Sequence, residues 1–156
     1  VANPIGSVTT PNGHLWAAPF EMNGEFGGTT PDTATGLAQP YSSAKLAAMM
    51  ALSDRANTTI AIIATDAPLG KAQCQRLATA AHDGIARAIV PAHSPMDGDL
   101  IFAVSTNSRE MRAPESDIRD IGHAAALCIA RAVARAVFHA RPAPGDLLPC
   151  WSDGAS

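Results

Sequence analysis

The 156 residues are enough for one modest domain and few for two, and 47% of them are apolar, with few aromatic side chains. The net charge of −3 is spread over mixed charges, without the basic runs that bind nucleic acid or the polybasic stretch that binds a membrane surface. The composition therefore predicts a soluble cytoplasmic protein with neither partner. Because the sequence begins at Val1 and not at methionine, we expect upstream sequence in the same polypeptide.

The first third of the chain predicts a hairpin, a loop and a helix. Short apolar runs at 6–10 and 14–17 flank Asn12-Gly13, a pair that tolerates positive φ and favours a tight turn. Residues 23–42 are rich in Gly, Thr and Pro and predict an exposed, mobile loop. Residues 43–53 have a helical apolar pattern behind two serines, which predicts a helix leading to the Asn57-Thr58 pair.

The rest of the chain alternates strands with long helices. Pro114, followed by Glu115, Ser116 and Asp117, is typical of a helix start, and the prolines after Arg141 predict a surface tail. The predicted order is strand 58–65, turn 66–70, helix 71–88, loop 91–98, strand 99–106, connector 107–113 and helix 118–140. Together with the hairpin, this order predicts an α+β fold with layers of helix against an antiparallel or mixed sheet.

The Asn57-Thr58 peptide bond stands directly before the apolar strand. Breaking it would create an N-terminal threonine, whose free amine is partly neutral at pH 7 and can take the proton of its own hydroxyl. The alternative is structural: two β-branched residues that open a strand after a loop asparagine.

Several motifs extend this idea along the chain. They are the A-T-D-A-P-L turn at 64–69, A-H-D-G-I-A-R at 81–87, H-x-x-x-D-G-D at 93–99 and PNGHLWAAPFE at 11–21. With the Asn-Thr junction, they resemble the L-aminopeptidase/D-esterase (DmpA) family, and its nylon-oligomer hydrolase branch in particular. The likeness covers nearly the whole chain except the Thr/Pro loop and the tail.

The resemblance implies an autoprocessed hydrolase with a layered αββα sandwich of the N-terminal-nucleophile type. Residues 1–57 would end the longer fragment of the precursor and residues 58–156 would form the shorter one, in one domain with the missing upstream sequence. Most aminopeptidases of the family cleave before serine, and the upstream region that carries a lysine and part of the substrate pocket is absent here. The substrate therefore stays open.

The resemblance also assigns roles to individual residues. Thr58 matches the nucleophile, which would also attack the Asn57 carbonyl during self-cleavage, and Asn3 matches an active-site asparagine that donates to an oxyanion. Asp97 and Asp99 match polar partners that orient the new amine and hydroxyl. From the residues alone, the structural alternative is that Asn3 is a turn residue before Pro4 and that Asp97-Gly98-Asp99 is a turn entering a strand.

Metal and cofactor chemistry have little support in the sequence. His93 with Asp97 and Asp99 could form a metal site, but the loop has no further histidine or cysteine, and a single histidine beside a turn is usually structural. The three cysteines lack C-x-x-C spacing, and neither G-x-S-x-G nor a phosphate-binding loop is present. We expect no metal and no organic cofactor.

These observations predict an N-terminal-threonine hydrolase that cleaves amide bonds of small peptides or peptide-like oligomers. Its partners would be an amide substrate, its own N-terminal fragment and further copies, in a homo-oligomer of processed heterodimers, because the alanine-rich helix stripes exceed what one small sheet covers. Two alternatives stay open: an acyltransferase of the ornithine acetyltransferase type, and a noncatalytic assembly protein with the Asn57-Thr58 bond intact.

Overall fold

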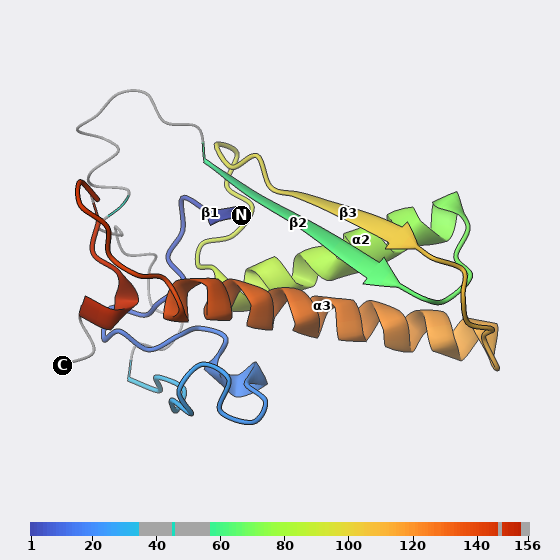
Figure 1. Ribbon diagram of the computed structural model, residues 1–156, viewed down its shortest axis with the longest axis horizontal. Helices are drawn as coiled ribbons and strands as arrows, with labels where there is room; N and C mark the ends of the chain where they lie inside the picture. Colours follow the sequence, from blue (N-terminus) through green and yellow to red (C-terminus); the bar gives the residue numbers. More distant parts are fainter. Residues whose placement is uncertain (35–44, 46–56, 147, 154–156) are drawn as a thin grey trace.

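The computed structural model describes residues 1–34, 45, 57–146 and 148–153 of the chain. Within these residues the fold is α+β, with one mixed sheet and two long helices (Figure 1). The elements are β1 (Ala2–Asn3), η1 (Ala18–Phe20), β2 (Thr58–Thr65), α2 (Lys71–Ala88), β3 (Leu100–Ser105), α3 (Pro114–Phe138) and η2 (Trp151–Asp153). The sheet order is β1-β2-β3 in the described part of the chain.

The centre of the fold is a β2-α2-β3 unit. β2 and β3 are parallel, in a register that pairs Ile60 with Leu100 and Thr65 with Ser105, and α2 makes the crossover that parallel strands require. The β-branched run of β2 suits a strand, and α2 starts directly after Gly70, whose N–H donates to the Gln73 side chain at 2.8 Å. The predicted strand at 58–65 and helix at 71–88 are confirmed, and the second strand is one residue shorter at each end than predicted.

The two helices pack together at a point of close backbone approach. α3 runs alongside α2 in Figure 1, and Gly84 of α2 faces the backbone of Ala126 in α3. The start signature at Pro114 is confirmed, but α3 itself begins there, four residues before the predicted bound of 118, and ends at Phe138, two residues before the predicted bound of 140. Asp117 accepts from the N–H groups of Arg112 and Ala113. By length and apolarity α3 would also pass for a membrane span, but its buried stripe packs in the core of this fold.

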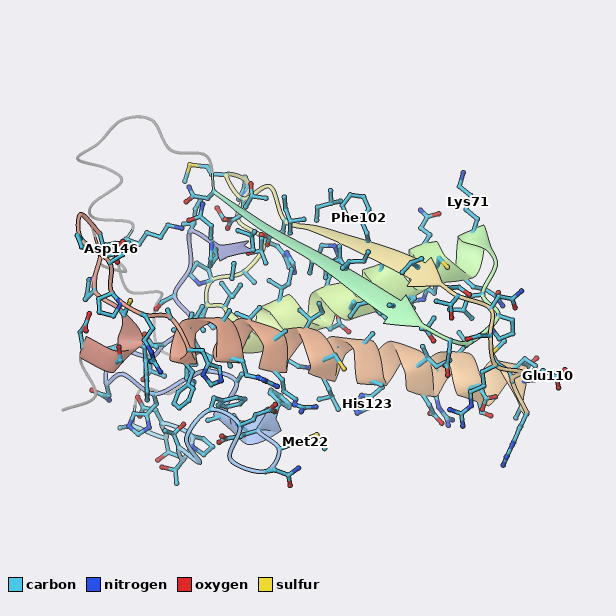
Figure 2. All side chains as sticks on the ribbon, viewed as in Figure 1. Met22, Lys71, Phe102, Glu110, His123 and Asp146 are labelled. Carbon is cyan, nitrogen blue, oxygen red and sulfur yellow. The ribbon has the colours of Figure 1, made fainter. Side chains whose placement is uncertain are left out.

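Among the described residues, the core lies on one side of the sheet. Buried side chains from both helices, β3 and the N-terminal segment form one cluster that includes Leu15, Phe26, Leu77, Ile85, Ile101 and Ile129. The opposite side of β2 and β3 carries exposed apolar side chains: Ile60, Ile62, Leu100, Phe102 and Val104. Figure 2 shows Phe102 pointing away from the helices. Since strand side chains alternate, the two strands are apolar on both faces and covered on one.

The predicted hairpin at 6–17 is reduced to a turn and one isolated bridge. Gly13 has a φ of 82°, as the Asn-Gly signal requires, and Thr9 bridges Leu15. Ser7, however, pairs with Val90 in a second isolated bridge. A Cβ on Gly6 would lie 2.1 Å from the Pro91 carbonyl oxygen, so this backbone packs directly on the segment after α2 and not on its neighbour in sequence.

The loop after the turn is anchored to α3 where it is described. Residues 23–34 form neither helix nor strand, and Glu25 forms ion pairs with Arg131 and Arg135. The hydrogen bond from Arg131 holds the pKa of Glu25 below its usual value. The rest of the predicted loop, 35–42, lies outside the described residues, as does the predicted helix at 43–53 except for Lys45, which is helical.

Candidate active site

Asn57 and Thr58 lie where β2 begins, and two donors converge on the carbonyl between them. The Thr58 hydroxyl donates to the Asn57 carbonyl oxygen at 2.5 Å, and the Gly98 N–H donates to the same oxygen at 2.9 Å. The second bond belongs to a parallel bridge between Asn57 and Asp97. The Gly98 N–H is placed to stabilise the negative charge that develops on this oxygen when a nucleophile attacks the carbon. The hydroxyl that would attack is therefore in contact with its target group.

Gly98 makes room for that hydroxyl. A Cβ at this position would lie 2.8 Å from the Thr58 hydroxyl oxygen and 3.5 Å from the Asn57 carbonyl oxygen. Any larger residue would therefore displace the hydroxyl from the carbonyl. In the sequence Gly98 appears only as the middle of a turn, because a backbone donor and a missing side chain leave no chemical signature.

Asn3 lies opposite Thr58 in the antiparallel register of β1 and β2. Its side-chain oxygen accepts a hydrogen bond from the Lys45 ammonium at 2.7 Å, and Lys45 also donates to the Pro4 carbonyl. Because Lys45 donates to the side-chain oxygen, the other branch of the Asn3 side chain is the NH₂ group, which can only donate. Sequence reasoning missed Lys45, since nothing local links it to a residue 42 positions away.

Asp97 joins the end of β1 to the start of the second parallel strand. One carboxylate oxygen accepts from the Ile5 N–H at 2.9 Å. The other is buried and has no hydrogen-bond partner among the described residues. Burial lowers the pKa of Lys45, and the negative charge of Asp97 partly opposes this shift, so the two charges act on each other at the site. A buried carboxylate oxygen that lacks a donor is suited to accept one from a substrate or a new amine.

Asp99 holds the residue after the nucleophile. Its carboxylate accepts from the Thr59 N–H at 3.1 Å, and its second oxygen lies 3.1 Å from Nδ1 of His93. The Asp99 side chain is 5% exposed. Behind His93, burial lowers the pKa of His82, and the neighbouring His93 lowers it further. Sequence reasoning took His93 as structural or as a metal ligand and did not predict its pairing with Asp99.

A cavity of about 820 Å³ opens beside this site. Its lining includes Asn3 and Lys45, together with Leu148 and Trp151 of the C-terminal segment. Thr58 is not among the lining residues, so the cavity meets the site on the Asn3 side. Its volume is in the range of pockets that bind small molecules.

The structure thus gathers all the predicted site residues around the first residues of β2. Asn3 comes from β1, while Asp97 and Asp99 come from the segment that enters β3 (Figure 1). The two carboxylates contact different segments: Asp97 binds the backbone after β1, and Asp99 the backbone of β2. Of these two carboxylates, His93 pairs with that of Asp99 in the described part of the chain.

Comparisons with known proteins agree on one family. The profile of peptidase family S58 matches residues 9–147. An uncharacterized aminopeptidase of Mycobacterium tuberculosis is 39% identical over 98% of this chain and 46% of its own length. An uncharacterized aminopeptidase of Mycobacterium leprae is 46% identical over 60% of this chain and 29% of its own length. The 6-aminohexanoate-oligomer endohydrolase of Paenarthrobacter ureafaciens is 33% identical over 38% of this chain and 17% of its own length. The chain spans about half the length of the mycobacterial relative that it matches throughout.

Proposed function

The chain belongs to peptidase family S58, and we propose that it is part of a self-processing hydrolase that uses Thr58 as an N-terminal nucleophile. The membership and the names of its relatives support hydrolysis of a peptide or amide bond. The substrate that we propose is a small peptide or a peptide-like oligomer. The observation that carries the proposal is the contact of the Thr58 hydroxyl with the Asn57 carbonyl, on which the Gly98 N–H also converges.

Self-cleavage would begin with attack of the Thr58 hydroxyl oxygen on the Asn57 carbonyl carbon. The carbon–nitrogen bond breaks, the proton of the hydroxyl passes to the departing nitrogen, and an ester joins Asn57 to the Thr58 side chain. Water then hydrolyses the ester, leaving a carboxylate on Asn57 and a free amine on Thr58. The Gly98 N–H stabilises the oxyanion of the first step.

Substrate hydrolysis would repeat the same chemistry on another amide. The Thr58 amine takes the proton of its own hydroxyl, and the hydroxyl oxygen attacks the substrate carbonyl carbon. The carbon–nitrogen bond of the substrate then breaks, and the Thr58 ammonium gives its proton to the departing amine. The Asn3 amide would donate to the oxyanion, the second oxygen of Asp97 would accept a hydrogen bond from the new amine, and Asp99 holds the Thr59 backbone. Water releases the acid product from the ester.

Intact-mass measurement of the purified protein tests this proposal. We expect two fragments that meet between Asn57 and Thr58, together with release of free acid from an amide substrate in the absence of any added amine. A transferase would release acid only slowly and would need an amine acceptor. One unbroken chain that is inert toward amides would contradict the proposal and would favour a noncatalytic assembly role.

We also propose that the exposed apolar face of β2 and β3 packs against a second sheet supplied by a longer polypeptide, which completes a layered αββα sandwich. Phe102 is 53% exposed and Ile62 66% exposed, at the centre of a face where the described residues provide no cover. The relatives are about twice as long as this chain, so a segment of sufficient length is available in the family. An apolar sheet face of this extent is typical of an interface.

The same substitution in two chain lengths tests the covering sheet. Phe102→Asp should destabilise the longer polypeptide by about 2 kcal/mol or more, because the carboxylate would be buried without a partner. In the 156-residue chain alone it should change the free energy of unfolding by no more than about 0.5 kcal/mol. Equal effects in denaturant titrations of the two lengths would contradict the sandwich.

A further inference from the structure

His93 connects helix α2 to the residue that follows the candidate nucleophile. Its Nδ1 lies 3.1 Å from the Asp99 carboxylate, and its Nε2 lies 3.4 Å from the His82 carbonyl oxygen. The rings of His82 and His93 have their centroids 5.2 Å apart. Figure 1 shows the loop that carries His93 beside the start of β2. With the proton on Nδ1 the imidazole donates to the Asp99 carboxylate, while its Nε2 faces a backbone carbonyl of α2.

The partner of His93 is a buried carboxylate whose two oxygens are both in use. Asp99 accepts from the Thr59 N–H with one oxygen and contacts His93 with the other, and its side chain is 5% exposed whereas that of His93 is 41% exposed. A buried carboxylate is costly unless both oxygens have donors. If His93 lost its donor, the carboxylate would turn toward water and release the Thr59 N–H.

The backbone of His93 is in an uncommon conformation that serves this contact. Its φ is 54°, in the left-handed region that few non-glycine residues adopt, and histidine is among those found there most often after glycine. The conformation turns the ring toward Asp99, and the pairing of the two side chains helps to hold it.

We propose that His93 is a positioning residue for the nucleophile: its imidazole fixes the Asp99 carboxylate, which holds the Thr59 amide and thereby sets the orientation of Thr58. The inference rests on the proposed function, in which Thr58 is the reacting residue. It assigns His93 no contact with substrate. Its effect passes through two hydrogen bonds, from the ring to Asp99 and from Asp99 to the backbone beside Thr58.

Two substitutions of His93 distinguish the effect of its hydrogen bond to Asp99 from the effect of its backbone conformation. Asn and Gly both accept a φ of 54°, but only His93→Asn keeps a donor near the place of Nδ1, while His93→Gly removes it. In the full-length protein, His93→Gly should lower kcat for an amino-acid p-nitroanilide roughly tenfold or more with little change in KM, because a misplaced nucleophile slows the chemical step. His93→Asn should restore most of kcat.

The rate of hydrogen exchange at the Thr59 amide reports whether its hydrogen bond to Asp99 is intact, independently of catalytic activity. The amide should exchange slowly in the wild type and in His93→Asn, and much faster in His93→Gly. Equal exchange in all three proteins, or equal loss of kcat in both variants, would overturn the inference. If the wild type is neither cleaved nor active while Thr59 exchange still follows the donor at residue 93, the positioning stands and the proposed function fails.

Discussion

Thr58→Val is expected to leave a folded polypeptide that is uncut after Asn57 and that hydrolyses amides at least roughly 1,000-fold more slowly than the wild type. Valine keeps the β-branched shape that suits the start of β2 and replaces the hydroxyl by a methyl group. The attacking oxygen is lost in both reactions, whereas the lost hydrogen bond to the Asn57 carbonyl lowers stability by only about 1 kcal/mol. Intact mass, amide turnover and thermal unfolding measure the three effects.

The adjacent threonine provides a matched control. The Thr59 side chain is buried, and its hydroxyl has no hydrogen-bond partner among the described residues. Thr59→Val therefore makes the same chemical change one position away, and it should keep self-cleavage and turnover while leaving stability unchanged or higher by about 1 kcal/mol. Thr58→Ser should also retain cleavage, since it keeps the hydroxyl. Wild-type turnover by Thr58→Val would contradict the proposed nucleophile.

The parts of the fold that the sequence predicted well are those with a local signal. The strand at 58–65 follows from its continuous run of apolar and β-branched residues, and the helix at 71–88 from its apolar period of 3.6; each segment shows its signal by itself. The hairpin at 6–17 failed as a strand pair because the partner of Ser7 is Val90, more than 80 positions away. A pairing of that kind has no trace in the residues beside Ser7.

The candidate site divides in the same way. Thr58 followed from the chemistry of the Asn-Thr junction, and Asn3, Asp97 and Asp99 followed from the family resemblance. The contributions of Gly98, Lys45 and His93 depend on distances between segments: a missing Cβ, an ammonium that reaches β1, and a ring that meets a carboxylate six residues later. None of these can be read from residue types and spacing.

Gly84→Ala is expected to destabilise the fold by about 2 kcal/mol or more, although alanine favours helices over glycine by about 1 kcal/mol. The added Cβ would lie 2.2 Å from the Ala126 carbonyl oxygen and 2.7 Å from the Ile129 Cβ, inside the contact between α2 and α3. Backbone atoms cannot move aside as a flexible side chain can, so the helices must separate and the core beneath β3 must loosen. Denaturant titration gives the change in the free energy of unfolding.

Gly122→Ala makes the same substitution on the facing helix, and it is expected to stabilise the fold and not to destabilise it. A Cβ there would meet only the Cβ of Ala80, at 3.4 Å, which is near an ordinary van der Waals distance. The helix-propensity gain should then dominate and raise stability by up to about 1 kcal/mol. Both glycines lie between α2 and α3. If the two substitutions changed the free energy of unfolding in the same direction, close backbone approach at Gly84 would not control how these helices pack.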